Sequence, residues 1–327
     1  MKIRVGVLRG GPSVEHEISL LTGANVLANL AKDKYQAVDI LISKNGDWPA
    51  YPEVDVMFNA LHGEYGEDGQ VQSVLEKKHL PYTGSGVKAS ALAMDKWASR
   101  KLFTQAGLKV APSIKIEKSS LEQILDSKFH IPNSNFGLPW VVKPASRGSS
   151  VGVSLVNNEK EFQLALEKAF QYDDFVLAEK YIKGREVTSG ILENFQGEKY
   201  FVLPAVEIIP PSDKFFFDEQ CKYDGTTQEI CPGRFNEKMT LIIQETARRA
   251  HLALGCRDYS RVDMIVAEDG IYPHTKDFGV GVYVLEVNTL PGLTDESLFP
   301  KAAAVIGLSF DRLLDHLLTL ALKRKGA

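Results

Sequence analysis

The two runs Arg261-Val262-Asp263 and Glu286-Val287-Asn288 each lie within a longer apolar stretch and place polar residues two positions apart. Side chains alternate between the two faces of a β-strand, so the polar residues of each run share one face. The connection between the runs can fold back as a hairpin, which would bring the two polar faces together. The side chains expected to converge are Arg261, Asp263, Glu286 and Asn288.

Two carboxylates and an amide oxygen suit Mg²⁺, which proteins usually hold with a few oxygen ligands while phosphate supplies the rest. A cation beside them suits a developing negative charge. The alternative is an ordinary polar outer face of a sheet. The turn at 289–294 argues against that alternative, because such loops often present backbone N–H groups to a ligand.

Short apolar runs alternate with helical patterns in the first ~95 residues, which is typical of parallel βαβ units in a small open α/β domain. A long helical stretch, 88–106, follows and is closed by Gly107. The expected strands before it are 3–8, 38–42 and 54–60, and the expected helices are 15–30 and 69–78.

The pattern changes after Gly107, where strand, turn, strand and helix predict an antiparallel α+β unit. The segment 207–234 is dense in Pro, Asp, Gly and aromatic residues and is interpreted as a long loop, a kind of segment that often forms a lid. The expected strands are 140–143, 151–156, 175–179, 260–266 and 282–288, and the expected helices are 159–170, 237–254 and 310–322.

The charge balance is slightly acidic, with 42 Asp and Glu against 38 Lys and Arg and a formal net charge of −4. A general nucleic-acid binder needs a basic face, so we expect no nucleic-acid partner. We find no apolar stretch long enough for a signal peptide or a membrane span, so we expect no membrane association. The cysteines, Cys221, Cys231 and Cys256, show no CxxC spacing and favour reduced thiols in a cytoplasmic protein.

The turn Gly148-Ser149-Ser150-Val151-Gly152 allows two interpretations. It fits the G-x-S-x-G nucleophile elbow, which would make Ser150 the nucleophile of a serine hydrolase, but that motif needs a helix after the turn. Here the following residues read as a strand, and a glycine- and serine-rich turn between strands suits phosphates better. A hydrolase would also need a later histidine, and the candidates are His251, His274 and His316.

Charged residues at strand ends are further candidates. Lys143 ends a strand directly before the glycine turn, and Lys96 is a second candidate phosphate binder. Glu15 follows the first strand, where ligands bind in open α/β sheets, and suits a substrate ammonium. For each lysine the alternative is a solvated surface residue, and for Glu15 it is a favourable charge in the first turn of a helix. His62 points to the same crevice, although a single histidine is often structural.

Together these segments resemble the D-alanine–D-alanine ligases, members of the ATP-grasp group, over nearly the whole chain. The motifs that carry the resemblance are Gly10–Glu17, His62-Gly63, Gly66–Gly69, Pro81–Gly86, Met94-Asp95-Lys96, Val142-Lys143-Pro144, Gly148–Gly152, Arg261-Val262-Asp263 and Leu285–Gly292. The resemblance implies an N-terminal α/β substrate-binding domain (1–95), a central ATP-grasp subdomain (96–185) and a C-terminal ATP-grasp subdomain (186–327) with a lid at about 207–234. It further implies D-alanine as substrate, ATP bound between the last two domains, two Mg²⁺ with Mn²⁺ able to substitute, and a homodimer.

The resemblance also implies roles at matching positions. ATP would be held by Lys96, Lys143, Ser149, Ser150, Glu179 and Glu186. Mg²⁺ would be held by Asp263, Glu286 and Asn288, and the oxyanion by Arg261 with the Gly292 backbone. The first D-alanine would be held by Glu15 and His62, and the second by Ser297 with the Leu298 backbone. The lid would bring Lys222 to the transferred phosphate and close Tyr223 onto Glu15 and Ser149.

The resemblance leaves the second substrate open, since related ligases use D-lactate or D-serine. Tyr223 favours an amine, because depsipeptide ligases usually lack tyrosine there. A regulatory module that has lost catalysis is a further alternative, against which the intact metal pattern argues. The chain departs from the family at Ser146-Arg147, at Phe217-Asp218-Glu219 and at an insertion, 273–281, between the two metal strands.

Overall fold

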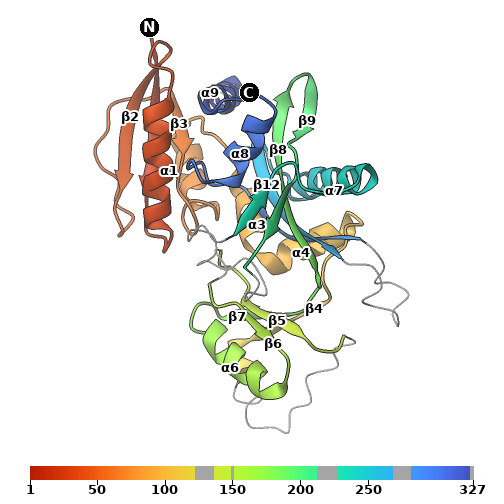
Figure 1. Ribbon diagram of the computed structural model, residues 1–327. Helices are drawn as coiled ribbons and strands as arrows, with labels where there is room; N and C mark the ends of the chain where they lie inside the picture. Colours follow the sequence, from red (N-terminus) through yellow and green to blue (C-terminus); the bar gives the residue numbers. More distant parts are fainter. Residues whose placement is uncertain (122–135, 149–150, 212–226, 268–280, 325–327) are drawn as a thin grey trace.

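The computed structural model describes residues 1–121, 136–148, 151–211, 227–267 and 281–324, arranged around three sheets (Figure 1). The N-terminal sheet and its helix lie at the left of the view, a small sheet lies at the bottom, and the largest sheet lies at the upper right. Each expected domain contains one of these sheets, and the boundaries at residues 95 and 185 stay predictions.

The N-terminal sheet has the strand order β2-β1-β3 and is parallel throughout, which confirms the expected βαβ units. Its central strand is apolar, with Val5, Val7 and Leu8 fully buried, as a strand covered on both faces requires. The carboxyl ends of β1 and β3 lie side by side, so the loops after them border one crevice. The elements are β1 (Ile3–Gly10), α1 (His16–Asn29), β2 (Tyr35–Ile42), β3 (Val56–Asn59) and α2 (Gln70–Lys77).

The smallest antiparallel unit has the order β4-β7-β5-β6 and packs against α6 around Trp140 and Phe162, whose rings meet edge to face at 5.3 Å. The expected strand 151–156 begins only at residue 154, because Gly152 takes a positive φ of 73°. The elements are β4 (Ser113–Glu117), the 3₁₀ helix η1 (Lys118–Ser120), β5 (Trp140–Pro144), β6 (Ser154–Val156), α6 (Glu159–Ala169) and β7 (Phe175–Lys180).

The largest sheet has the order β11-β10-β8-β12-β13, with β9 paired to β8. The predicted hairpin is confirmed, since β12 and β13 are antiparallel with Asp263 opposite Glu286 and Arg261 opposite Asn288. The elements are β8 (Gly184–Phe195), β9 (Glu198–Val202), β10 (Val206–Ile209), β11 (Gln228–Ile230), α7 (Glu237–Leu254), β12 (Tyr259–Ala267), β13 (Val282–Asn288), α8 (Leu298–Val305) and α9 (Phe310–Lys323).

The prediction of a single helix at 88–106 is wrong. The chain forms α3 (Val87–Met94) and α4 (Lys96–Gln105), separated by Asp95 in an extended conformation. The Asp95 carboxylate accepts hydrogen bonds from the backbone N–H groups of Trp97 and Ala98, so it caps the second helix. Helical periodicity continues across the break, which explains why the pattern alone did not show it.

The predicted bounds of the loop, 207–234, are also too wide. Residues 207–209 continue β10, and β11 pairs antiparallel with that strand. The middle of the segment, including Lys222 and Tyr223, lies outside the described residues. The short helix α8 and the strand β4 were not predicted, because neither is long enough to show a clear period.

An apolar core joins the N-terminal sheet to the C-terminal helices. Val7 and Phe58 from β1 and β3 share this core with Phe299 of α8 and with Leu314 and Leu317 of α9. α9 also contacts α1, so the two ends of the described chain pack together (Figure 1).

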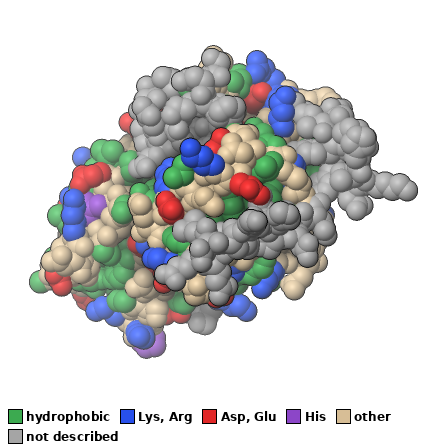
Figure 2. Space-filling view, turned by 90° about the horizontal axis from the view of Figure 1, so that it is seen from below, with side chains coloured by type: hydrophobic (Ala, Val, Ile, Leu, Met, Phe, Trp, Pro, Cys, Tyr) green, Lys and Arg blue, Asp and Glu red, His purple; other side chains and the backbone are tan. Residues whose placement is uncertain are grey.

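We find no helix in the described residues that is both long and apolar enough to cross a bilayer. Cys231 and Cys256 are free thiols, as expected, and Cys221 lies outside the described residues. On the face shown in Figure 2, basic and acidic side chains are interspersed with apolar ones.

Candidate active site

Two cavities lie between the sheets and meet at a common wall. The first encloses about 140 Å³ and is bordered by the loops after β1 and β3, by β13 and by the start of α8. The second encloses about 160 Å³ and lies between the β5–β7 sheet and the β8–β12–β13 sheet. The side chains that border both cavities are Lys96, Arg261, Glu286 and Leu298.

The polar faces of β12 and β13 meet as predicted. The Arg261 guanidinium donates its Nε–H to Asp263 Oδ1 and its Nη2–H to Asp263 Oδ2, both at 2.9 Å. Asp263 also accepts from Asn288 Nδ2 at 2.9 Å and from the Thr188 hydroxyl at 2.6 Å. Burial opposes charge on the guanidinium, but Asp263 outweighs burial and raises the pKa of Arg261, so this side chain stays charged.

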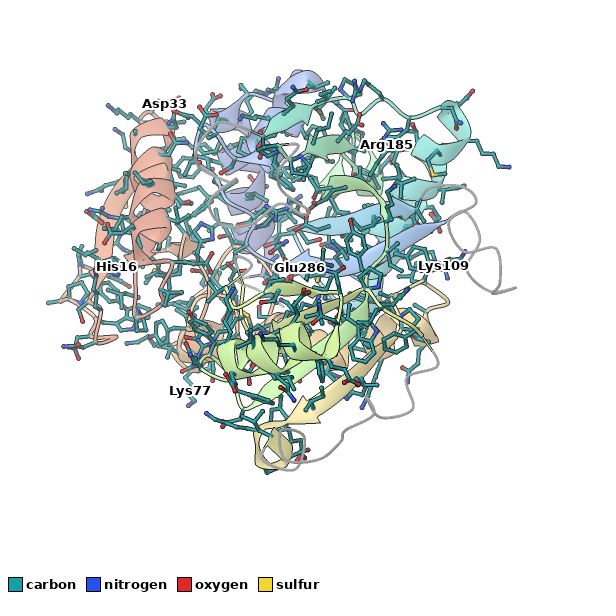
Figure 3. All side chains as sticks on the ribbon, turned by 60° about the horizontal axis from the view of Figure 1, so that its bottom comes forward. His16, Asp33, Lys77, Lys109, Arg185 and Glu286 are labelled. Atoms are coloured by element: carbon teal, nitrogen blue, oxygen red, sulfur yellow. The ribbon has the colours of Figure 1, made fainter. Side chains whose placement is uncertain are left out.

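Lys96 is the first residue of α4, and its side chain borders both cavities. Its Nζ lies 2.7 Å from Glu286 Oε2 on β13, and its side chain is only 9 % exposed. Burial opposes charge on this ammonium, yet the Glu286 carboxylate outweighs burial and raises the pKa of Lys96. Figure 3 shows Glu286 near the centre of the molecule, between the strands of the largest sheet and the smaller sheet.

The oxygen donors at this junction fit Mg²⁺. Asp263 and Glu286 are register partners on adjacent strands, and the amide of Asn288 lies beside them. In the described residues we find no group of three or more His, Cys, Asp or Glu with metal-binding geometry. A cation here would therefore rely on two carboxylates, one amide oxygen and phosphate oxygens, which is the partial protein coordination that Mg²⁺ accepts.

The second cavity combines apolar walls with a buried charge cluster. Lys143 Nζ lies 3.0 Å from Glu179 Oε2, and Glu179 Oε1 accepts from Arg100 Nη1 at 2.7 Å. Burial lowers the pKa of Lys143 despite the neighbouring carboxylate. The apolar side chains along the walls are Val141, Val153, Ile182, Ile208, Ile265 and Leu285.

Two acidic residues that were predicted to hold nucleotide border this cavity. Glu186 borders it from β8, and Glu179 borders it from β7 with its carboxylate engaged by two cations. Arg100 was missed by the sequence interpretation. The available signal was its position four residues after Lys96, which places both side chains on one face of a helix.

The first cavity brings together the acidic and imidazole groups that follow β1 and β3. His62 Nε2 is 2.8 Å from the Thr22 hydroxyl, and its Nδ1 is 3.3 Å from Glu67 Oε1. Glu67 also accepts from the Gly63 backbone at 3.0 Å. Burial raises the pKa of Glu67 although His62 opposes that change. Glu67 lies in the Gly66–Gly69 motif, and its contact with His62 was not predicted from the sequence.

Glu15 borders the first cavity close to the glycine turn. A β-carbon at Gly63, which has a φ of 69°, would lie 2.5 Å from Glu15 Oε2 and closer still to Ser13 Oγ, so glycine is favoured there. A β-carbon at Gly148 would lie 3.3 Å from Glu15 Oε2. The carboxylate therefore lies between two glycine-containing loops that come from different sheets.

Ser297 and Leu298 border the other end of the first cavity at the start of α8. The Ser297 hydroxyl accepts from the Thr294 backbone at 3.0 Å and lies 2.8 Å from the Thr294 hydroxyl. A β-carbon at Gly292 would lie 2.8 Å from Ser297 Oγ. This end of the cavity therefore offers a hydroxyl and the first turn of a helix, a combination that suits a carboxylate.

The other predicted functional residues, Ser149, Ser150, Lys222 and Tyr223, lie outside the described residues, as does nearly all of the 273–281 insertion. Ser146-Arg147, where the chain departs from the family just before the glycine turn, has a structural role. Ser146 donates its backbone N–H to Asp173 at 2.7 Å, and Arg147 forms an ion pair with Glu64 from the loop after β3.

Of the histidines considered for a hydrolase, His251 and His316 make structural contacts, and His274 lies outside the described residues. His251 Nδ1 is 2.7 Å from the Ser260 hydroxyl and its Nε2 is 3.5 Å from Glu193. This arrangement has the composition of a catalytic triad, but Ser260 and His251 are fully buried and border neither cavity. His316 bonds the Glu193 backbone carbonyl at 2.8 Å. The hydrolase hypothesis therefore has no support in the described residues.

Family models match most of the chain. A D-ala D-ala ligase C-terminus model matches residues 102–319, and a D-ala D-ala ligase N-terminus model matches residues 4–53 and 49–85. The D-alanine--D-alanine ligase of Syntrophobacter fumaroxidans is 42% identical and covers 98% of both chains. That of Citrifermentans bemidjiense is 44% identical over 98% of this chain and 96% of the relative.

Solved structures agree with these sequence matches. The D-alanine--D-alanine ligase of Bacillus anthracis complexed with ATP superposes with a TM-score of 0.79 at 33% identity, covering 99% of each chain. The VanG D-Ala:D-Ser ligase of Enterococcus faecalis superposes with a TM-score of 0.83 at 30% identity, covering 98% of this chain and 100% of VanG. The fold is therefore the ATP-grasp fold with an N-terminal α/β unit.

Proposed function

The chain belongs to the D-alanine–D-alanine ligase family, and we propose that it joins two D-alanines at the expense of ATP, for cell wall peptidoglycan. The observation that carries this proposal is the meeting of two cavities at Lys96, Arg261 and Glu286. A nucleotide in the second cavity and an amino acid in the first would bring a phosphate and a carboxylate to the same charged junction.

The proposed reaction has two steps. The first D-alanine carboxylate takes up the terminal phosphoryl group of ATP, which releases ADP and leaves an acyl phosphate. The amine of the second D-alanine attacks that carbonyl, and loss of phosphate and a proton leaves the dipeptide. Mg²⁺, when bound, would neutralise charge on the phosphate oxygens, with two ions held by Asp263, Glu286 and Asn288.

The second cavity suits the nucleotide. Its apolar walls accommodate an adenine ring, while Lys143 and Lys96 offer cations to the phosphates. Glu186 would accept from the ribose hydroxyls. Glu179 would act mainly through Lys143, because both of its carboxylate oxygens already pair with cations.

The first cavity suits two small amino acids. Glu15 would bind the ammonium of the first D-alanine, with His62 beside it. Ser297 and the backbone of Leu298 at the start of α8 would hold the carboxylate of the second. Arg261 and the Gly292 backbone would stabilise the oxyanion, since Arg261 faces both cavities with its charge retained.

The remaining parts of the proposal concern the lid, the location and the assembly. Lys222 and Tyr223 would close over the site, with Ser149 and Ser150 at the phosphates, and so keep water from the acyl phosphate. We also propose a cytoplasmic enzyme, consistent with free thiols at Cys231 and Cys256, and a homodimer.

The alternative is a ligase that takes D-lactate or D-serine as second substrate. This alternative is less favoured, because the relatives that are 42–44% identical over nearly the whole chain are D-alanine--D-alanine ligases.

The deciding experiment supplies purified protein with ATP, Mg²⁺ and D-alanine, alone or with D-lactate or D-serine, and measures phosphate release and product mass. We expect phosphate release with D-alanine alone and a product with the mass of D-alanyl-D-alanine. Absence of phosphate release under that condition would sink the proposal. A mixed product formed in preference to the dipeptide would support the alternative instead.

Asp263→Asn tests the metal site within the same assay. We expect it to abolish most phosphate release and to weaken the response to Mg²⁺, because it removes one of two carboxylates. Glu198→Gln changes an exposed carboxylate on β9 that borders neither cavity; it is the matched control and should leave the rate unchanged. Equal rates for both variants would contradict the assignment of Asp263 as a ligand.

A further inference from the structure

A buried residue outside both cavities completes the charge cluster of the nucleotide cavity. Arg100 is 3 % exposed and borders neither cavity. Its Nη1 donates to Glu179 Oε1 at 2.7 Å, and its Nη2 donates to the backbone carbonyl of Ala111. The opposite carboxylate oxygen, Glu179 Oε2, lies 3.0 Å from Lys143 Nζ. Glu179 is thus divided between one cation that faces the cavity and one that does not.

The helix α4 supplies the cations that pair with acidic residues on both walls of the nucleotide cavity. Lys96 and Arg100 are four residues apart, so their side chains leave the same face of the helix one turn apart. Lys96 pairs with Glu286 on β13 at 2.7 Å, whereas Arg100 pairs with Glu179 on β7. One helix face therefore links the largest sheet to the β5–β7 sheet.

The charge balance explains why a second cation is needed. Arg100, Lys143 and Glu179 together carry one more positive than negative charge. Without Arg100, Glu179 and Lys143 would form a neutral pair, and the lysine would have less attraction for a phosphate. Burial alone would raise the pKa of Glu179, but Arg100 and then Lys143 outweigh it and hold that pKa below its ordinary value.

The geometry of the same bonds constrains the direction of Lys143. A carboxylate held on one side by a guanidinium has little freedom to rotate, because the Arg100 fork is itself held by Ala111. The remaining oxygen, Glu179 Oε2, then pairs with Lys143 from a fixed position. Arg100 Nε has no hydrogen-bond partner among the described residues. Nη1 and Nη2 therefore make the contacts with Glu179 and Ala111.

We propose that Arg100 is a positioning residue for nucleotide binding, which acts through Glu179 to aim Lys143 at the phosphates. The inference rests on the proposed use of the second cavity for ATP. It differs from the roles given to Lys143 and Glu179, since Arg100 borders neither cavity.

The test measures ADP affinity by calorimetry and the steady-state constants for ATP and D-alanine separately. We expect Arg100→Met to weaken ADP binding and raise the KM for ATP about tenfold, the loss expected when one charge-assisted hydrogen bond is removed. The KM for D-alanine should stay within about twofold, since Arg100 is absent from the first cavity. Arg100→Lys, which keeps the charge, should recover part of the loss. Lys101→Met, on the exposed side of α4, is the control and should resemble the unmodified protein.

A second comparison separates positioning from folding. In a Glu179→Gln background, adding Arg100→Met should change ADP affinity by less than about twofold, because the residue through which Arg100 acts is already altered. The double variant has no unpaired carboxylate at position 179, so this comparison can still be made if Arg100→Met alone is too unstable to measure. A further tenfold loss in that background would overturn the proposal.

The outcomes also distinguish this inference from the proposed function. Wild-type protein that binds ADP but releases no phosphate with D-alanine would contradict the ligase activity, and the Arg100 comparison would still be decided by ADP affinity. Wild-type protein that is an active ligase, with an Arg100→Met variant of unchanged ADP affinity, would contradict the role of Arg100 alone.

Discussion

Replacing Arg261 by lysine tests whether the guanidinium fork matters beyond its charge. Arg261 donates two hydrogen bonds of 2.9 Å to the two oxygens of Asp263, and the two side chains are 18 % and 17 % exposed. Lysine keeps the positive charge but has a single Nζ, so it cannot reproduce the planar, two-pronged contact. The substitution removes at least one charge-assisted hydrogen bond at a largely buried position.

The magnitude follows from that loss. A hydrogen bond to a charged group contributes about 1.5–3 kcal/mol, which corresponds to about a ten- to hundredfold change in rate if it is made in the transition state. We expect Arg261→Lys to lower kcat by this factor, while ADP affinity changes less than about threefold, because Lys143 and Lys96 stay in place.

The assay is phosphate release at saturating ATP and D-alanine, accompanied by the thermal midpoint of each variant. Arg248→Lys is a matched control, because Arg248 also makes a two-pronged contact, to Glu245, at 2.8 and 2.7 Å on the surface of α7. It should leave kcat within about twofold, as expected of an exposed ion pair. A full kcat in Arg261→Lys, or an equal loss in both variants, would refute the reasoning.

Three further substitutions test the scaffold around the site. Arg324→Met should lower the free energy of unfolding by about 3 kcal/mol in urea titrations, because it leaves Asp258, 1 % exposed, without its guanidinium partner; an unchanged midpoint would contradict this. Burial would raise the pKa of Glu207, but hydrogen bonds from two arginines lower it from an ordinary 4.5 to about 2. Its contribution to stability should be present above pH 4.5 and disappear as the pH falls towards 2, and this loss should be smaller in Glu207→Gln when unfolding is measured across that range. Gly190→Ala should lower the thermal midpoint, since a β-carbon would lie 2.7 Å from Phe299 Cε2, a clash that costs about 1–3 kcal/mol; a wild-type midpoint would show that the core relaxes.

The break between α3 and α4 shows how a local feature positions a functional side chain. Asp95 ends the apolar stripe of α3 and caps α4, which makes Lys96 the first residue of a new helix. Its ammonium then reaches Glu286 on a strand nearly two hundred residues later in the sequence. A continuous helix would have rotated and displaced Lys96, so the cap matters for the junction of the two cavities.

Local patterns were sufficient for the elements with clear periods. The helix 237–254 and the strand 282–288 were predicted with their observed bounds, because their apolar spacing is regular. The convergence of Arg261, Asp263 and Asn288 also followed from strand alternation, once the hairpin was assumed. Short elements such as β4 and α8 were missed, since eight residues or fewer give little periodic signal.

The sequence by itself determined the fold class, the family resemblance and the set of charged residues that could bind metal and phosphate. Those properties depend on residue type and spacing, which are local. The tertiary structure alone decided that two cavities meet at Lys96 and Glu286, that Glu179 is shared between two cations, and that Arg100 belongs to the cluster. These contacts join α4 to strands that follow it by many tens of residues, and only the packing of the sheets brings such groups within hydrogen-bond distance. The metal pattern on β12 and β13 was therefore readable in the chain, whereas its place where the two cavities meet required the fold.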